Sequence, residues 1–227
     1  MSRTYAIAVL SDIHYASAAE KARGNSYEFL GINSPLERLV ARAYRHFIWL
    51  RHPMGHNHLL DEFLQRMDSP DHVVANGDYS CNSAFVGVSD DAACQSAGEC
   101  LGKLRSKFGA NFRATFGDHE LGKLSFMGGQ GGMRLASWHR ARNELALQPF
   151  WRVELGNYVL MGVASSLVAL PVYEPDTLAT ELAEWQALRA QHLVEIHRAF
   201  GDLKPEQHVL LFCHDPTALP FLWRDET

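Results

Sequence analysis

Aspartate and histidine residues occur in short clusters that each follow an apolar run of the chain. The clusters read Ser-Asp-Ile-His-Tyr, Asn-Gly-Asp-Tyr, Phe-Gly-Asp-His-Glu and Leu-Leu-Phe-Cys-His-Asp. Carboxylate and imidazole groups together suit divalent transition metals such as manganese, iron or zinc. The pattern therefore predicts a metal site assembled from separate parts of the sequence. Its candidate residues are Asp12, His14, Asp78, Asp118, His119 and His214.

A pair of such ions is suited to phosphoester chemistry. Two ions ~3.5–4 Å apart, bridged by a carboxylate, can clamp a phosphoryl group and lower the pKa of a bound water. They also neutralise charge during an in-line displacement. The leaving oxygen then needs a proton, which a histidine beside the metals can supply.

Short strands separated by helices must position these residues. Apolar runs bounded by polar residues predict strands at residues 5–10, 72–75, 112–116, 158–163 and 208–213. Apolar residues at helical spacing predict helices at 59–67 and 178–200. This order predicts a layered α/β fold with central β-sheets flanked by helices. In such sheets, ligands bind at the carboxyl ends of the strands.

Residues 15–57 form a helical insertion or cap after the first strand. Apolar residues within 35–52 recur at helical spacing beside four arginines, Arg38, Arg42, Arg45 and Arg51. Such a stretch could contact a membrane surface or cover the site above a lipid-like or nucleotide substrate. The alternative is a helix packed on the domain with solvated arginines. A glycine-rich segment at 121–132 predicts a loop near the site.

The ordered motifs D-x-H, G-D, G-D-H-E and a lone histidine after an apolar strand resemble those of calcineurin-like metallophosphoesterases. The resemblance extends from Asp12 to His214. It implies a single metallophosphoesterase-like domain over residues 1–227. It also implies hydrolysis of a small phosphorylated substrate, a monoester, diester or pyrophosphate, by a metal-bound hydroxide at a dinuclear centre.

The resemblance assigns the metal ligands position by position. Asp12 and His14 would bind one divalent ion of manganese, iron or zinc, and Asp78 would bridge to the second. Asp118 and His214 would complete the second site. Asp118 departs from the family, which usually has asparagine there, so a charged ligand replaces a neutral one.

The same resemblance gives roles to residues around the metals. His119 would act as general acid or oxyanion partner and would not itself bind metal, while Glu120 would support the loop. Basic residues after the glycine-rich segment could contact a substrate phosphate. They are His139, Arg140 and Arg142.

A second departure concerns the motif that closes the family's site. The family has G-H-x-H after a further strand, but none follows His214, which predicts that the C-terminal strands are missing. The G-H-x-H at residues 55–58 lies between the first and second motifs. His56 or His58 could substitute as a ligand, contact substrate, cap the following helix or lie in a solvated loop. The alternative function is a catalytically impaired or truncated phosphoesterase-fold protein that acts as a binding or scaffold module.

Composition limits the partners. A net charge of -5 gives no basic surplus for nucleic acid, so no nucleic-acid partner is expected. No apolar run approaches the ~20 residues that span a bilayer. The N-terminal apolar run is too short for a signal peptide, which predicts a cytoplasmic protein.

Overall fold

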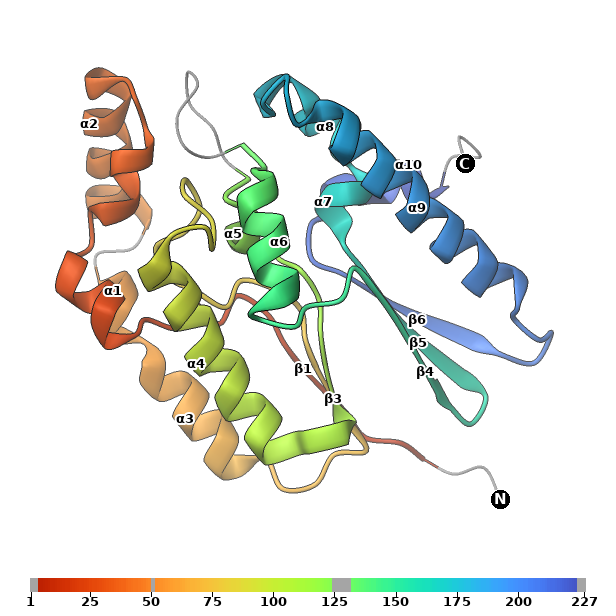
Figure 1. Cartoon of the computed structure of the whole chain (residues 1–227). Coiled ribbons are helices and arrows are strands. Elements are labelled where there is room, and N and C mark those ends of the chain that lie inside the picture. The colour runs from red at the N-terminus through yellow and green to blue at the C-terminus, as the bar shows by residue number, and fades with distance from the viewer. Residues whose placement is uncertain (1–3, 50–51, 124–131, 224–227) are drawn as a thin grey trace.

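Figure 1 shows the fold in a computed structural model that describes residues 4–49, 52–123 and 132–223. The strands are β1 (Ile7–Leu10), β2 (His72–Ala75), β3 (Phe112–Ala114), β4 (Phe150–Leu155), β5 (Tyr158–Val163) and β6 (His208–Cys213). The α-helices are α1 (Ala18–Arg23), α2 (Pro35–Tyr44), α3 (Asn57–Arg66), α4 (Asp91–Phe108), α5 (Asp118–Leu121), α6 (Leu135–Asn143), α7 (Ser165–Val168), α8 (Leu170–Tyr173), α9 (Leu182–Gly201) and α10 (Leu219–Trp223). Single helical turns are η1 (Tyr27–Gly31), η2 (Arg45–Trp49), η3 (Pro53–Gly55), η4 (Gly109–Asn111), η5 (Glu174–Asp176) and η6 (Pro216–Ala218).

The described strands form two sheets of three strands each. In the first, β1, β2 and β3 are all parallel, and Leu10, Ala75 and Ala114 lie in register at their carboxyl ends. In the second, β5 pairs antiparallel with β4 and parallel with β6. Parallel strands share one edge for their carboxyl ends. The segments that follow β1, β2 and β3 therefore begin at the same edge of the sheet.

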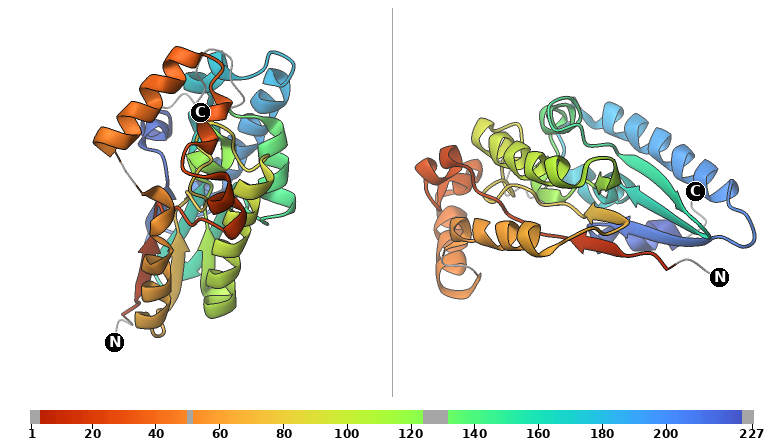
Figure 2. Two further views of the ribbon diagram at one scale, coloured as in Figure 1. Left: turned by 90° about the vertical axis from the view of Figure 1, so that its left-hand side faces the viewer. Right: turned by 90° about the horizontal axis from the view of Figure 1, so that it is seen from below.

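The two sheets pack face to face between helices. The first sheet shares the main apolar core with α4, which begins at the N-cap Asp90. Its other face presents Val74 to Trp151 and Leu160 of the second sheet. The far face of the second sheet packs on Ala199 of α9. The resulting order is helix, sheet, sheet, helix, which runs from α4 to α9 across Figure 1. Figure 2 shows the same elements from two further sides.

The predicted α/β class with sheets flanked by helices is confirmed. The predicted strands at 72–75, 158–163 and 208–213 coincide with β2, β5 and β6, whereas β1 and β3 are shorter than predicted. The strand β4 and the helices α4 and α6 were not predicted. In β4, Arg152 and Glu154 alternate with Trp151 and Val153, a period of two that is typical of a strand with one buried face.

The predicted insertion contains α1, η1, α2, η2 and η3. Ser34 caps the N-terminus of α2, since its hydroxyl accepts a hydrogen bond from the Glu37 backbone, and Pro35 is the first residue of the helix. Arg38 donates to the Ile32 carbonyl, so this arginine is tethered to the preceding turn. Residues 50–51 of the predicted basic stretch and 124–131 of the glycine-rich segment lie outside the described residues. Across 4–49, 52–123 and 132–223, no helix has the length and apolar character to cross a membrane.

The Trp151 ring, which faces Val74 of the first sheet, lies over Gly162, its partner on the neighbouring strand β5. A Cβ on Gly162 would lie 2.1 Å from Cε2 of Trp151. We predict that Gly162→Ala lowers the free energy of unfolding by roughly 1–3 kcal/mol, since the Trp151 ring must move. The control is Gly102→Ala in α4, where a Cβ meets open space. There the helix should gain about 0.5–1 kcal/mol. Urea unfolding measures both, and equal effects would contradict this packing.

Candidate metal centre

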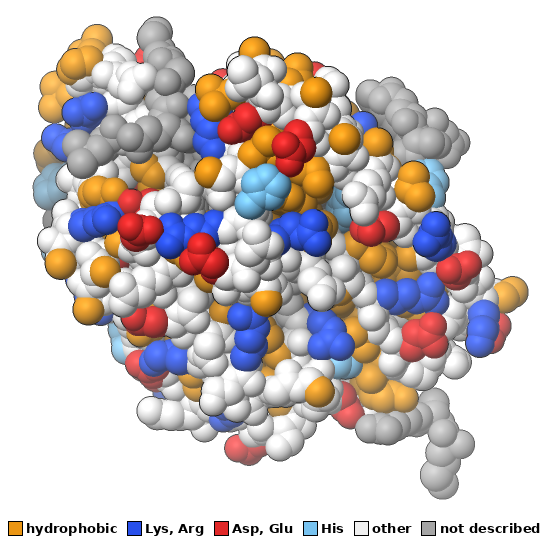
Figure 3. Space-filling view, in the orientation of Figure 1, with side chains coloured by type: hydrophobic (Ala, Val, Ile, Leu, Met, Phe, Trp, Pro, Cys, Tyr) orange, Lys and Arg blue, Asp and Glu red, His pale blue; other side chains and the backbone are white. Residues whose placement is uncertain are grey.

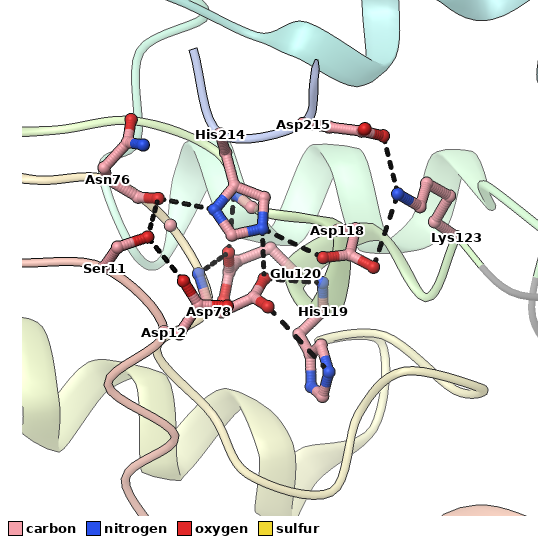
Figure 4. A network of polar contacts seen from close by, with 12 residues as sticks. Ser11, Asp12, Asn76, Asp78, Asp118, His119, Glu120, Lys123, His214 and Asp215 are labelled. Atoms are coloured by element: carbon pink, nitrogen blue, oxygen red, sulfur yellow. Dashed lines mark hydrogen bonds and ion pairs between the residues drawn. The ribbon is translucent and has the colours of Figure 1, made fainter. Parts of the chain in front are cut away.

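The chain brings the predicted ligands together at the ends of four strands. Figure 4 shows Asp12, Asp78, Asp118 and His214 among them. Asp12 and His14 follow β1, Asp78 follows β2, and Asp118 begins α5 directly after β3. His214 follows β6, so it reaches the site from the second sheet. The candidate site therefore lies where the carboxyl ends of β1, β2, β3 and β6 meet.

Three of these residues adopt an unusual backbone conformation. The φ angles of Asp12, His14 and Asp78 are 53°, 47° and 59°, in the left-handed region that residues with a Cβ seldom occupy. Backbone hydrogen bonds hold them there, since the His14 N–H donates to the Asp78 carbonyl at 2.9 Å. The next pair, Tyr15 N–H to the Tyr79 carbonyl at 3.0 Å, continues this contact. Strained backbone of this kind is typical of functional sites.

Glu120 fastens the loop after β2 to the loop after β3. Its buried carboxylate accepts three backbone hydrogen bonds, from Asp78 at 3.0 Å, Tyr79 at 2.8 Å and Gly117 at 2.8 Å. Burial and the charge of Asp78 raise the pKa of Glu120 to about 7, against the effect of these donors. The predicted supporting role of Glu120 thus has a specific geometry, in which one side chain fixes two ligand-bearing loops.

Two glycines allow these loops to approach. Gly77 has a φ of 91°, and a Cβ there would lie 2.6 Å from Gly117 Cα and 2.7 Å from His214 Nδ1. A Cβ on Gly117 would lie 2.2 Å from Asp78 Oδ1. Any side chain at either position would displace a candidate ligand, which accounts for glycine before both Asp78 and Asp118.

The orientation of two histidines fits a bound cation. His214 Nδ1 lies 2.6 Å from the Asn76 carbonyl, and His14 Nδ1 lies 3.4 Å from the Ser80 carbonyl. A carbonyl oxygen only accepts, so each Nδ1 carries the proton and a neutral ring directs its Nε2 lone pair elsewhere. His214 Nε2 faces Asp78 Oδ1 at 3.3 Å and Asp118 Oδ1 at 3.0 Å. Carboxylates also only accept, so without a metal ion Nε2 of His214 carries a proton, and a bound cation would take the place of that proton.

The electrostatics of the histidines differ. Burial lowers the pKa of His14, and the nearby His119 lowers it further. Burial also opposes protonation of His214, but hydrogen bonds to Asp118 and Asp78 outweigh it and raise its pKa to about 11. The site thus contains a neutral imidazole and a second imidazole in a strongly negative environment.

Two groups of potential ligands share Asp78 within the described part of the chain. One contains Asp12, Asp78 and His214, and the other contains His14, Asp78 and His119. In each, the ligand atoms lie within 4.8 Å of one another. The shared position of Asp78 agrees with the predicted bridge. The division differs from the expected one, because His119 joins His14, while Asp118 contacts the site through His214.

His119 lies directly beside the candidate ligands. Its Nε2 is 3.9 Å from Asp78 Oδ2, and its Nδ1 is 3.2 Å from the Ser83 hydroxyl. Its ring meets that of His14 edge-on, with centroids 4.6 Å apart. Burial disfavours the charged ring, but Asp78 and Asp118 outweigh this effect and raise the pKa of His119. The geometry is compatible both with the predicted proton donor and with a ligand.

A lysine offsets the unusual charge of Asp118. Lys123 Nζ lies 3.4 Å from Asp118 Oδ2 and 2.6 Å from Asp215 Oδ2. Asp215 also accepts a hydrogen bond from the Tyr173 hydroxyl at 2.6 Å. Burial raises the pKa of Asp215, but Lys123 and Tyr173 lower it overall to about 2. The ammonium group is therefore held between two ionised carboxylates.

A cavity of about 830 Å³ opens at the ligands. Its lining includes Asp12, His14, Asp78 and His119, and it continues toward α2 of the insertion. Apolar side chains also gather on the outer surface of α2, at the upper left of Figure 3.

Five further predicted contacts are not brought to the cavity or to the two ligand groups. His56 is the N-cap residue of α3, and His58 Nδ1 lies 3.1 Å from the Gly55 carbonyl. His139 pairs with a glutamate of α9, Glu184, at 3.2 Å. Arg140 pairs with Asp91 and Glu144, and the Arg142 guanidinium lies over the Trp138 ring.

Sequence reasoning missed three residues that hold the site. The Asn76 carbonyl orients His214, the Ser83 hydroxyl contacts His119, and Lys123 offsets the charge of Asp118. Asn76 is the first residue of the Asn-Gly-Asp-Tyr motif, so the sequence already shows that it lies close to Asp78. Ser83 and Lys123 act through contacts that the sequence does not reveal.

No protein-family model matches this chain, and no curated protein matches it significantly. The function must therefore be inferred from the geometry of the residues and from the motifs that they form.

Replacement of Glu120 by glutamine should loosen both ligand-bearing loops. The amide keeps one acceptor oxygen and directs an NH₂ group toward backbone donors, so at least one buried N–H loses its partner. We predict that Glu120→Gln lowers the free energy of unfolding by about 1–3 kcal/mol and weakens manganese binding. The control is Glu144→Gln, since the exposed Glu144 pairs at the surface with Arg140 and otherwise accepts a long contact of 3.7 Å from the Cys94 thiol. Urea unfolding measures the stability and calorimetry measures the manganese binding. A Glu120 variant as stable as the control would show that this carboxylate does not hold the two loops together.

Proposed function

We propose that this protein is a metal-dependent phosphoester hydrolase with a dinuclear centre. The observation that carries the proposal is the arrangement around Asp78, whose carboxylate faces histidines from three other segments. Two of these histidines donate Nδ1–H to a backbone carbonyl and direct Nε2 toward carboxylates. This donor set suits manganese, iron or zinc.

The motifs assign Asp12, His14 and Asp78 to one ion, and Asp78 with Asp118 and His214 to the other. The proximity of the ligand atoms instead groups Asp12 and His214 with Asp78, and His14 and His119 with Asp78. The motif assignment is the one proposed, since it leaves His119 available for proton transfer. Bound ions of this kind act as Lewis acids toward a phosphoryl oxygen and lower the pKa of a coordinated water. Three protein ligands for each ion leave a coordination position open, as in catalytic zinc sites.

His119 is suited to proton transfer at the leaving oxygen. It lines the cavity beside Asp12 and Asp78, and its Nδ1 contact with Ser83 fixes the ring orientation. Its raised pKa, caused by Asp78 and Asp118, favours a proton on the ring. A positioned acid of this kind contributes directly to departure of the leaving group.

The second candidate function is a binding or scaffold module of the same fold. One observation favours it. The Lys123 ammonium group lies 3.4 Å from Asp118 Oδ2 and already offsets part of the negative charge that a second metal ion would neutralise. If manganese-loaded protein releases no product from phosphate monoesters, diesters or pyrophosphates, this second function is preferred.

Two substitutions separate metal binding from proton transfer. We predict that Asp78→Ala abolishes hydrolysis and removes bound metal, because both ligand groups include Asp78. His119→Ala should retain metal but lower kcat by roughly 10²–10⁴-fold, the usual contribution of general acid catalysis. His139→Ala, which removes only an exposed ion pair with Glu184, is the control. Elemental analysis and product release measure these effects, and full activity of His119→Ala would disprove the assigned role.

A further inference from the structure

We infer that the ligand of this site is amphiphilic: a phosphoester whose organic part is an apolar chain held against α2. The inference rests on the proposed function for the phosphate end and adds the chemical class of the other end. The cavity of about 830 Å³ joins the two, since its lining contains both the metal-ligand residues and an apolar set from the insertion and the segment after β2. The apolar set is Phe29, Leu36, Val40, Ala41, Tyr44 and Phe85.

The apolar part of the cavity lining has a buried floor, formed by Phe29 and Phe85, and an exposed wall, formed by Leu36 and Val40 of α2. Phe29 and Phe85 are 4% and 9% exposed, and their ring centroids lie 6.0 Å apart, so they form a packed aromatic surface. On α2, by contrast, Leu36 is 70% exposed and Val40 is 60% exposed. Removing such apolar surface from water is favourable. An alkyl or acyl chain lying between floor and wall would cover both.

The charges in the lining argue against a polyanionic ligand such as a nucleotide polyphosphate. The Arg45 guanidinium pairs with the buried Glu28 at 2.5 Å and donates to the Asn25 carbonyl at 2.9 Å. Glu37 adds a carboxylate whose buried Oε2 has no hydrogen-bond partner within the described residues. A second phosphate near α2 would meet this negative charge. A hydroxyl on the ligand would instead provide the missing donor for Glu37.

Continuity with the candidate metal centre identifies the occupant. Exposed apolar helices also bind membranes or other proteins, but those contacts would use the outer surface of α2 and would not require its side chains to line a cavity that reaches Asp78 and His119. The ligand chain is thus expected to contribute binding energy in proportion to its length.

The test uses the full manganese-loaded chain and n-alkylphosphonates with butyl, hexyl and octyl chains, below their micelle concentrations. Their P–C bond resists hydrolysis, so calorimetry measures binding without turnover. We expect the dissociation constant to fall about two- to fourfold per methylene. Val40→Asn should weaken octylphosphonate binding at least about fivefold, because it places an amide in the apolar wall. Val194→Asn on α9 is the matched control, since Val194 is 59% exposed and does not line this cavity.

The outcomes distinguish this inference from the proposed function. Affinity that rises with chain length and falls in the Val40 variant alone supports the amphiphile site. Affinity that does not change with chain length, or absence of phosphonate binding, overturns it, and vesicle binding lost with the same variant would then assign α2 to a membrane. Product release from n-octyl phosphate and 4-nitrophenyl octyl phosphate is measured in parallel. Its absence would reject hydrolysis without affecting the binding result.

Discussion

The carboxylate of Glu120 is the contact on which the geometry of the site depends. It accepts backbone hydrogen bonds from Asp78 and Tyr79 on one loop and from Gly117 on the next, and it is fully buried. A buried carboxylate is tolerated only when its acceptors are used, so the two loops must keep this spacing. The left-handed backbone at Asp78 then presents its side chain to three histidines.

The sequence predicted the location of the site better than its internal geometry. Asp12, Asp78, Asp118 and His214 each follow an apolar run, and apolar runs of that length form strands whose carboxyl ends converge. The sequence could not show that His214 arrives from a second sheet, because pairing partners depend on contacts distant in sequence. Strand β4, which completes that sheet, was not predicted, although its polar and apolar residues alternate as they do in a strand with one buried face.

Other features depend on tertiary contacts that no motif encodes. Lys123 lies between Asp118 of α5 and Asp215 of the loop after β6, two residues that are far apart in the sequence. The motif alone shows the extra negative charge of Asp118 but not the lysine that offsets it. The insertion illustrates the same limit: helical spacing predicted α2 but left open whether it covers the site or packs on the domain, and only the fold places it beside the cavity.

The central claim is that Asp78 joins two cation sites. Calorimetric titration of metal-free protein with manganese, checked by elemental analysis after desalting, tests it most directly. The shared position of Asp78 in both ligand groups predicts two ions per chain, with both lost together in Asp78→Asn. A single ion per chain that survives Asp78→Asn would contradict the claim.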